Sequence, residues 1–398
     1  MLSLCMPFLG GMMISTNRPL QVLVASDDPE ALKGLFTSED SIQYHIVLRQ
    51  QGLRELAHQR FDLALIDQDF LLLEEMAKAR KECFSEGMPL LLLHNPLEGP
   101  DRIRAFNLGA VDCIFKPFEV QELASKIHNY GKSYRNQIDL EKAMILIEND
   151  LRAASVIQER LLPPDLYQTY SFLLKYRYIP SSSLAGDLVG YKLVQDALAF
   201  YVFDVMGHGV AAAMISTLIS IQMNEIYFML PQKMLDIPFV LKILDADLQS
   251  HISGDDCFYA TGVYGVLHKN GLLEYALAGH PEPILVHRAK KKAQILPNLE
   301  PLCPVVGLGM IPKKVEPQRI QIQPDEHVFL YTDGILEQTN SVQEEFGIER
   351  VIETLGESTL DNPFDHLLHT LKRYSGAKNF NDDITLLSVG FTPKQNPR

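Results

Sequence analysis

The chain has few basic residues for its acidic content. Its 398 residues include 36 Lys and Arg against 50 Asp and Glu, which gives a formal net charge of −14. Proteins that hold nucleic acid rely on clustered Lys and Arg to neutralise phosphates. The charge balance therefore argues against a nucleic-acid partner, and no C-terminal helix-turn-helix pattern or basic face supports a DNA-binding regulator.

Cysteine and long apolar runs are also scarce. The five cysteines are far apart and show no CxxC spacing, so the sequence predicts neither a disulfide framework nor a zinc site and favours a reduced cytoplasm. The apolar start, MLSLCMPFLGGMMIS, lacks the Lys or Arg of a secretory signal and is too short to span a membrane. No other apolar run has spanning length, so we expect no membrane segment.

The sequence does not decide which methionine is the natural start of the chain. The first clear strand pattern begins at Gln21, so Met12 or Met13 is an alternative start, and residues 1–11 need not belong to the natural protein. The length and a hydrophobic share of 46% predict two to three packed globular domains.

Residues 20–131 alternate short apolar runs with helix-compatible stretches. The runs are VLVAS, YHIVL, LALI, LLLL and CIF. Strands that alternate with helices predict an α/β doubly wound domain of the flavodoxin-like type, with a parallel sheet. Functional groups of such sheets gather at the carboxyl ends of the strands.

Charged residues follow three of these runs. Asp27 and Asp28 follow the first run, Asp67 follows the third and Lys116 follows the fifth. Three carboxylates at one sheet edge suit Mg²⁺, and a lysine beside them could hold a phosphoryl oxygen. Taken singly, each of these residues is more simply explained as a solvated loop cap.

With its GAVDCIFKPF stretch, this segment resembles the receiver domain of bacterial response regulators. The resemblance implies that Asp27 and Asp28 form the acidic pair, that Asp67 is the phosphoacceptor, and that Lys116 completes the site. It also implies a bound Mg²⁺ and a cognate histidine kinase. His94 occupies the switch position, where the family has Thr or Ser.

A second departure is QDFLLL, which replaces the usual Met-Pro-Gly loop after the acceptor. The imidazole of His94 can still donate a hydrogen bond, but it is bulkier than a hydroxyl and titrates near neutrality. The alternative interpretation is a pseudo-receiver that serves as a docking or dimerisation module.

Residues 132–163 form a predicted helical linker, because they contain no Gly or Pro before Pro163. Apolar residues recur there at spacings of four and three, which predicts a helix of roughly twenty-five residues with a coiled-coil seam. The seam either packs on the following domain or pairs with a second subunit, and we favour a homodimer through residues 138–161. The seam residues are Leu140, Met144, Ile147, Leu151, Ala154, Ile157 and Leu161.

Residues 164–393 have longer β-type runs, interrupted by two helical stretches. This pattern predicts an α+β sandwich rather than a second parallel sheet. The helical stretches are GVAAAMISTLISIQMNEIYFML and VLKILDADLQSHI, and the strand runs are FLLKYRYIP, ALAFYVFDV, FYATGVYGVLH, LLEYALAG, PILVHR, HVFLYTDG and ITLLSVGF.

Four acids stand in or beside apolar runs of this region: Asp187, Asp204, Asp333 and Asp382. Packed sheets would bring them together, and like charges at one place require cations. Oxygen ligands without a His or Cys cluster select Mg²⁺ or Mn²⁺ over zinc or copper. Two such ions roughly 3.5–4 Å apart would activate a water for in-line hydrolysis of a phosphoester.

The order of the motifs AGD, FDVMGHGVAAAM, LAGHPEPIL, LYTDGILEQTN, EEFG and NDDITLL resembles a metal-dependent phosphatase of the PPM class, in its SpoIIE- and RsbU-like branch. The resemblance implies an αββα sandwich that holds two Mn²⁺ or Mg²⁺. It makes Asp204 the bridging ligand, helped by the Val205 carbonyl, with Asp333 and Asp382 on one metal and Asp187 on the other. Asp204, Asp333 and Asp382 would then be the catalytic residues.

Four further positions carry weaker expectations. Asp383 is expected to orient its neighbour, and Gly190 stands where many relatives have a further Asp. His208 is a possible general acid, because a leaving serine oxygen needs a proton, although a turn histidine can be purely structural. For His280 we expect a role in shaping the fold. Residues 288–294, RAKKKAQ, are expected at a solvated hairpin tip.

The sequence therefore predicts a receiver-regulated, metal-dependent serine/threonine phosphatase. Its relatives act in partner switching, so the expected substrate is a phosphorylated protein such as an anti-sigma-factor antagonist. The alternative is a non-enzymatic adaptor, resembling RssB-type proteins, that binds a sigma factor or its regulator under receiver control. Retention of the four acids favours the enzyme, since a scaffold has little use for clustered charges that repel without metals.

Overall fold

The computed structural model describes residues 18–33, 36, 41–67, 87–95, 103, 105–107, 109–169, 171–251, 258–287, 289–297, 303–357, 363–376 and 379–391. The chain divides into two compact units, Met1–Ile147 and Glu148–Arg398. The QDFLLL loop and the chain start lie outside the described residues. The three-part division into residues 20–131, 132–163 and 164–393 stays a prediction.

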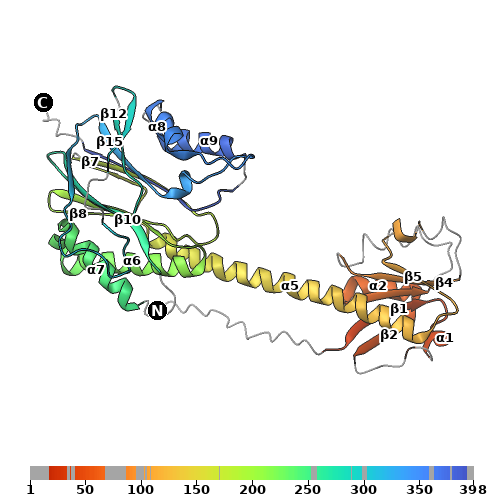
Figure 1. Ribbon diagram of the computed structural model, residues 1–398. Helices are drawn as coiled ribbons and strands as arrows, with labels where there is room; N and C mark the ends of the chain where they lie inside the picture. The colour runs from red at the N-terminus through yellow and green to blue at the C-terminus, as the bar shows by residue number, and fades with distance from the viewer. Residues whose placement is uncertain are drawn as a thin grey trace. The chain divides into compact units, whose positions relative to one another are not determined.

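The N-terminal unit is a five-stranded parallel sheet in the order β2-β1-β3-β4-β5 (Figure 1). This is the strand order of doubly wound, flavodoxin-like sheets. Apolar clusters lie on both faces of the sheet, which is why runs such as LALI and LLLL are continuously buried. The elements are β1 (Leu20–Ser26), α1 (Pro29–Lys33), β2 (Ile42–Leu48), α2 (Arg49–His58), β3 (Leu63–Asp67), β4 (Leu90–His94) and β5 (Asp112–Phe115).

Helix α5 (Val120–Leu161) has 42 residues and corrects the prediction of a separate linker helix of about twenty-five. It runs without a break through Gly131, at the expected start of the linker. Gly131 faces Leu20 of β1, where an added Cβ would lie 3.3 Å from the leucine side chain. A helical glycine costs only about 0.5–1 kcal/mol relative to alanine, so packing on the sheet outweighs it.

The predicted seam of α5 lies largely in solvent within one chain. Leu140, Met144, Ile147 and Ile157 are exposed, whereas Leu151, Ala154 and Leu161 are half-buried. No helix in the described part of the chain is long and apolar enough to cross a membrane.

The C-terminal unit contains two antiparallel sheets, in the orders β14-β11-β10-β9-β8 and β13-β12-β15-β16-β7-β6. Their inner faces meet in one apolar core, to which residues such as Leu174, Phe200, Val263, Val328 and Leu387 contribute. The strands are β6 (Leu166–Gln168), β7 (Phe172–Ile179), β8 (Leu188–Val194), β9 (Ala197–Val205), β10 (Ala260–His268), β11 (Leu272–Ala278), β12 (Ile284–His287), β13 (Lys292–Ile295), β14 (Gln318–Gln321), β15 (Glu326–Tyr331) and β16 (Ile384–Phe391).

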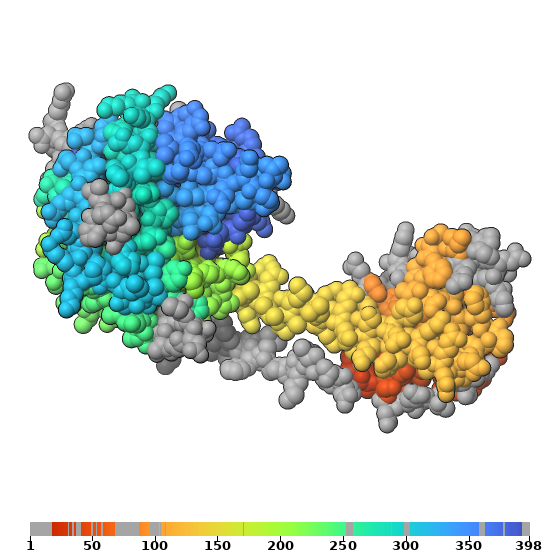
Figure 2. Space-filling model, viewed as in Figure 1, coloured from red at the N-terminus to blue at the C-terminus, as the bar shows by residue number. Residues whose placement is uncertain are grey.

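Helices cover both outer faces of this sandwich (Figure 1). The first sheet packs against α6 (Val210–Met229) and α7 (Ile237–His251), and the second packs against α8 (Gly347–Glu357) and α9 (Pro363–Ser375). In Figure 2 the β12–β13 hairpin and α8 form one continuous surface, in keeping with the packing of α8 on both strands. The four layers agree with the predicted αββα sandwich.

Candidate active site

A cleft of about 540 Å³ opens at one end of the sandwich, and three of the four predicted acids line it. Asp204 lies near the end of β9, Asp333 begins the 3-10 turn Asp333–Ile335 after β15, and Asp382 lies two residues before the start of β16. The first sheet thus contributes Asp204, and two neighbouring strands of the second sheet contribute the other two acids. The full lining is Ser181, Ser182, Asp204, Val205, Met206, Gly207, His208, Tyr259, Thr261, Asp333, Phe380, Asn381 and Asp382.

Asp187, the fourth acid, is buried just before β8 and does not line the cleft. Its Oδ2 accepts a hydrogen bond of 2.8 Å from the Thr332 hydroxyl, and that hydroxyl accepts one of 2.9 Å from the Thr385 backbone N–H. Thr332, which precedes the predicted catalytic acid Asp333, therefore holds Asp187 in place.

Electrostatics place the acids close together. Burial, followed by the charges of Asp187, Asp333 and Asp382, raises the pKa of Asp204 to about 9. Burial also raises the pKa of Asp187 to about 8. These directions mean that the protein's own groups disfavour negative charge here, so a bound cation would stabilise the ionised acids.

The Asp383 side chain is hydrogen-bonded to two other segments of the chain. Its Oδ1 accepts hydrogen bonds from the Ser181 backbone N–H at 2.7 Å and from the Ser181 hydroxyl at 2.9 Å, and its Oδ2 accepts one from the Gly186 N–H at 2.8 Å. The Asp383 backbone N–H donates to Asp382 Oδ1 at 2.7 Å. Both oxygens of Asp383 are thus engaged, in line with the expectation that this residue orients its neighbour.

Glycine permits two close approaches in the site. A Cβ at Gly186 would lie 3.1 Å from the Val205 carbonyl oxygen, so the segment before Asp187 is packed against the predicted carbonyl ligand. A Cβ at Gly334 would lie 2.1 Å from the Asp383 carbonyl oxygen. Only glycine allows these segments to come so near one another.

The donor chemistry fits a hard divalent cation. The described lining of the cleft offers three carboxylates and the Val205 residue and contains no Lys or Arg. Among the described residues, however, no three His, Cys, Asp or Glu side chains already stand in an arrangement that could hold a metal. Asp187 already accepts a hydrogen bond from the Thr332 hydroxyl, so an ion at this carboxylate would share it with that donor.

His208, His280 and Gly190, for which the sequence supports weaker expectations, also have defined surroundings. His208 is exposed in the cleft, near enough to Asp382 to oppose the rise that burial causes in the pKa of that carboxyl. His280 is buried, which lowers its pKa to about 3, and it lies 3.0 Å from the Thr261 hydroxyl. At Gly190 an added Cβ would lie 2.2 Å from the Tyr201 ring, so no side chain fits there.

The predicted receiver residues gather at the carboxyl edge of the parallel sheet. The Asp67 carboxylate forms an ion pair with Lys116 and accepts a hydrogen bond of 3.0 Å from the Ser26 hydroxyl. Asp27 and Asp28 are exposed beside it. His94 is buried at the end of β4, with its ring edge-on to Phe115 at 4.9 Å.

Sequence reasoning missed Ser26. This residue ends β1 and precedes the acids assigned to the acidic pair. Its hydroxyl also accepts a hydrogen bond of 3.1 Å from the Asp28 backbone N–H, so it links the start of that loop to Asp67. A hydroxyl residue at the end of a buried strand was the available signal.

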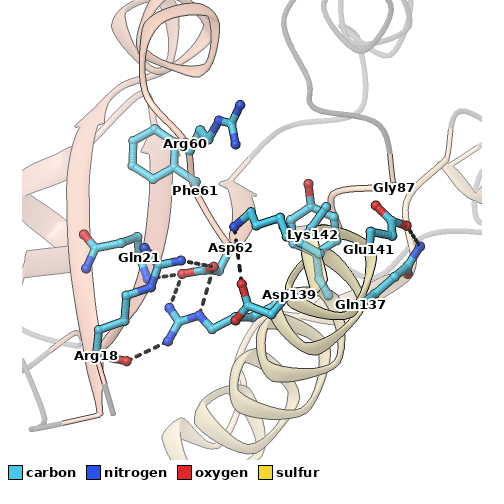
Figure 3. Close-up of a pocket in the computed structure, with 13 residues that line it drawn as sticks. Arg18, Gln21, Arg60, Phe61, Asp62, Gly87, Gln137, Asp139, Glu141 and Lys142 are labelled. Carbon is cyan, nitrogen blue, oxygen red and sulfur yellow. Dashed lines mark hydrogen bonds and ion pairs between the residues drawn. The ribbon is translucent and has the colours of Figure 1, made fainter. Parts of the chain in front are cut away.

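A larger cavity, of about 650 Å³, lies at the opposite, amino-terminal edge of the same sheet (Figure 3). Asp62 is at its centre, and its carboxylate accepts hydrogen bonds from Arg135 of α5 and from the Gln21 backbone N–H. Lys142 pairs with Asp139 at 3.3 Å, as Figure 3 shows. We assign this cluster a structural role, because it fastens α5 to the sheet.

The four layers and the acid-lined cleft define the C-terminal unit as a phosphatase fold of the PP2C, or PPM, class. Residues 195–392 match the family model described as Stage II sporulation protein E (SpoIIE). The SiaA-PP2C domain of Pseudomonas aeruginosa has the same fold, with a TM-score of 0.53 and 22% identity over 63% of this chain and 98% of that domain. The C-terminal unit is therefore a SpoIIE-type phosphatase domain.

Two curated relatives show similarity in sequence. Protein IcfG of Synechocystis sp. is 26% identical over 269 residues, which covers 60% of this chain and 41% of the relative. Phosphoserine phosphatase RsbP of Bacillus subtilis is 27% identical over 199 residues, which covers 49% of this chain and 47% of the relative. The matches thus span less than half the length of either relative.

Proposed function

We propose that this protein is a metal-dependent protein serine/threonine phosphatase that the N-terminal unit regulates as a receiver domain. The observation that carries the proposal is the convergence of Asp204, Asp333 and Asp382 on one cleft, with Asp187 buried behind them. Folding brings together acids from distant parts of the chain at an electrostatic cost that a bound cation would relieve.

The proposed roles of the residues are those that the resemblance to the PPM class implies. Asp204, with the Val205 carbonyl, is the proposed bridging ligand, Asp333 and Asp382 hold one ion, and Asp187 positions the other. Two Mn²⁺ or Mg²⁺ would supply an acidified water and neutralise phosphate charge. The described residues of the cleft provide no Lys or Arg to bind the substrate phosphate, so neutral donors such as Ser182 and Asn381 orient it.

The proposed substrate is a phosphoserine or phosphothreonine of a protein, such as an anti-sigma-factor antagonist. The similarity to a phosphoserine phosphatase supports this substrate class. The cleft is open enough to admit a side chain from a folded partner, because His208, Met206 and Asn381 at its rim are exposed.

The test is hydrolysis of p-nitrophenyl phosphate and of a phosphorylated antagonist protein in the presence of Mn²⁺. We expect turnover by the wild type and its loss in Asp204→Asn and Asp333→Asn. The matched control is Asp196→Asn, an exposed acid of the same unit that pairs only with Lys269, and it should keep full activity. A folded wild type that is inert on both substrates would leave the adaptor function instead.

For the N-terminal unit we propose phosphorylation of Asp67 by a cognate histidine kinase, with Mg²⁺ held by Asp27, Asp28 and Asp67. The support is the placement of Asp67 at the carboxyl edge of the sheet, with Lys116 on one carboxylate oxygen and Ser26 on the other. A phosphoryl group on Asp67 would compete for both contacts.

Labelling with acetyl phosphate tests this part independently of the phosphatase assay. Incorporation should require Mg²⁺ and should disappear in Asp67→Ala. Asp139→Asn, which changes an acid at the other edge of the same sheet, should label as the wild type does. Label that persists in Asp67→Ala would refute the assignment.

We also propose that the protein is a homodimer through residues 138–161. The exposed side chains of Leu140, Met144, Ile147 and Ile157 support this arrangement, because one chain leaves them uncovered. Sedimentation equilibrium should give a dimer for the wild type and a monomer when Leu140 and Met144 are both changed to Lys. A monomeric wild type at micromolar concentration would contradict the proposal.

A further inference from the structure

The last turns of α5 contain one buried polar side chain, Gln158. It is 9% exposed, although its chain neighbours Ile157 and Glu159 lie in solvent. Its amide Nε2 donates to the Ala185 carbonyl oxygen at 2.7 Å and to the Ser216 hydroxyl at 3.1 Å, and its Oε1 accepts from the Ala185 N–H at 3.2 Å. Both ends of the side-chain amide are therefore used.

The bonds to Ala185 have the pattern of a strand partner. The Ala185 N–H donates to Gln158, and the Ala185 carbonyl oxygen accepts an N–H from it, as residues of neighbouring strands do. Ala185 itself is fully buried and lies before the start of β8, and among the described strands none pairs with it. A glutamine of the helix thus helps to fix the position of this segment.

That segment leads directly to the proposed metal site. The Gly186 N–H donates to Asp383, Gly186 packs against the Val205 carbonyl oxygen, and Asp187 follows. The third contact of Gln158, Ser216, belongs to α6, which begins just after the loop of the cleft. One side chain therefore links the residues before Asp187 to the helix behind the cleft.

We propose that Gln158 is a positioning residue for the metal site, acting through the Ala185–Gly186 backbone on Asp187. The proposal rests on the phosphatase function proposed above and extends the machinery of that site to the helix that precedes the domain. Residues behind metal ligands typically change metal affinity or activity by about 10–100-fold when they are replaced. Gln158 acts on Asp187 only through the backbone of Ala185 and Gly186. We therefore expect its replacement to weaken the affinity for the metal by about tenfold, at the lower end of that range.

Glutamine suits this place better than its isosteres. A glutamate of the same shape could accept the Ala185 N–H, but it would face the Ala185 carbonyl oxygen and the Ser216 oxygen without a proton to donate. A methionine would fill the volume but leave the buried Ala185 N–H without its acceptor, and the Ala185 carbonyl oxygen would keep only the 3.4 Å bond from the Ser216 hydroxyl. The structure therefore predicts that both substitutions loosen the segment.

The experiment measures metal binding rather than turnover alone. Calorimetric titration of the metal-free full chain with Mn²⁺ should show affinity about tenfold weaker in Gln158→Met and Gln158→Glu than in the wild type. Hydrogen exchange should show the amides of residues 185–187 opening about tenfold faster in Gln158→Met. Arg152→Gln, which changes an exposed residue of the same helix, should match the wild type in both measurements.

The outcomes separate this inference from the proposed function. A wild type that binds no Mn²⁺ would overturn the phosphatase proposal itself. A wild type that binds Mn²⁺ with both Gln158 variants within twofold of it would overturn only the positioning role. Loss of folding in both variants, seen by circular dichroism, would overturn it as well, because Gln158 would then serve domain stability rather than the site. In a folded Gln158→Met protein, the apparent KM for Mn²⁺ should rise more than kcat falls.

Discussion

The sharpest prediction concerns Gly334, the glycine of the TDG motif. An added Cβ would lie 2.1 Å from the Asp383 carbonyl oxygen and 3.3 Å from the Asp382 Cβ. Ordinary contacts begin near 3.4 Å, so alanine at this position requires the backbone of Asp383 to retreat by about 1.3 Å. The retreat would move Asp382 away from Asp333, and these two residues are the proposed ligands of one ion.

The expected loss follows from that displacement. A misplacement of about 1 Å can cost roughly a hundredfold in rate, which corresponds to about 2.7 kcal/mol in the activation barrier. Overpacking of a buried position also lowers stability, by about 1–3 kcal/mol. We therefore expect Gly334→Ala to fold with a lower melting temperature and to have a kcat about a hundredfold below that of the wild type.

The assay is steady-state hydrolysis of p-nitrophenyl phosphate at saturating Mn²⁺, with circular dichroism to confirm folding. The matched control is Gly356→Ala in α8, where an added Cβ would have its nearest neighbour at 3.5 Å and fits without strain. That variant should keep the wild-type kcat and gain up to about 0.5–1 kcal/mol in stability. A folded Gly334→Ala protein with kcat within about threefold of the wild type would refute the proposed pairing of the two segments.

Three further predictions concern charge and packing. Burial, with the surrounding carboxylates, raises the pKa of Asp204 to about 9. The metal-free protein should therefore lose stability as the pH rises from 6 towards 9, by up to about 1.4 kcal/mol per pH unit. Urea denaturation at several pH values should show this loss in the wild type and a smaller loss in Asp204→Asn or with Mg²⁺ bound. Asp62→Asn and Arg135→Met should each cost about 3–5 kcal/mol, because each leaves a buried partner unpaired; additive losses in the double mutant would contradict the pairing. Gly190→Asp should lower the melting temperature and bind no additional ion in a calorimetric titration, because Tyr201 fills the space, and an extra bound ion would show that Tyr201 can move.

Much of the sandwich could be predicted because its strands are strongly patterned. Runs such as ALAFYVFDV and ITLLSVGF became β9 and β16, and both expected helices formed as α6 and α7. Sequence reasoning missed β8, whose segment LVGYKLV contains a glycine and a lysine and follows directly after Asp187. It also missed α8 and α9, because the apolar residues of these amphipathic helices are separated by polar ones and form no long apolar run.

The site was harder to predict than the fold. Acids in motifs identified the cleft, but motif reading could not show that Asp187 lies behind it or that Asp383 uses both oxygens within the protein. The contacts of Ser26 and Gln158 were hard to predict for a different reason, since polar residues near the ends of strands and helices usually face solvent. Their roles depend on contacts between segments far apart in sequence, which local patterns do not encode.

The unbroken course of α5 affects how fragments of this protein should be cut. The family match begins at residue 195 and the expected domain border at 164, but the compact C-terminal unit begins at Glu148. A truncation at residue 164 removes Gln158, which holds Ala185 in place, and a truncation at residue 195 removes Ala185 and Asp187 as well. Expression of a catalytic fragment, or fusion of a foreign sensor to it, should therefore retain the chain from residue 148 onward.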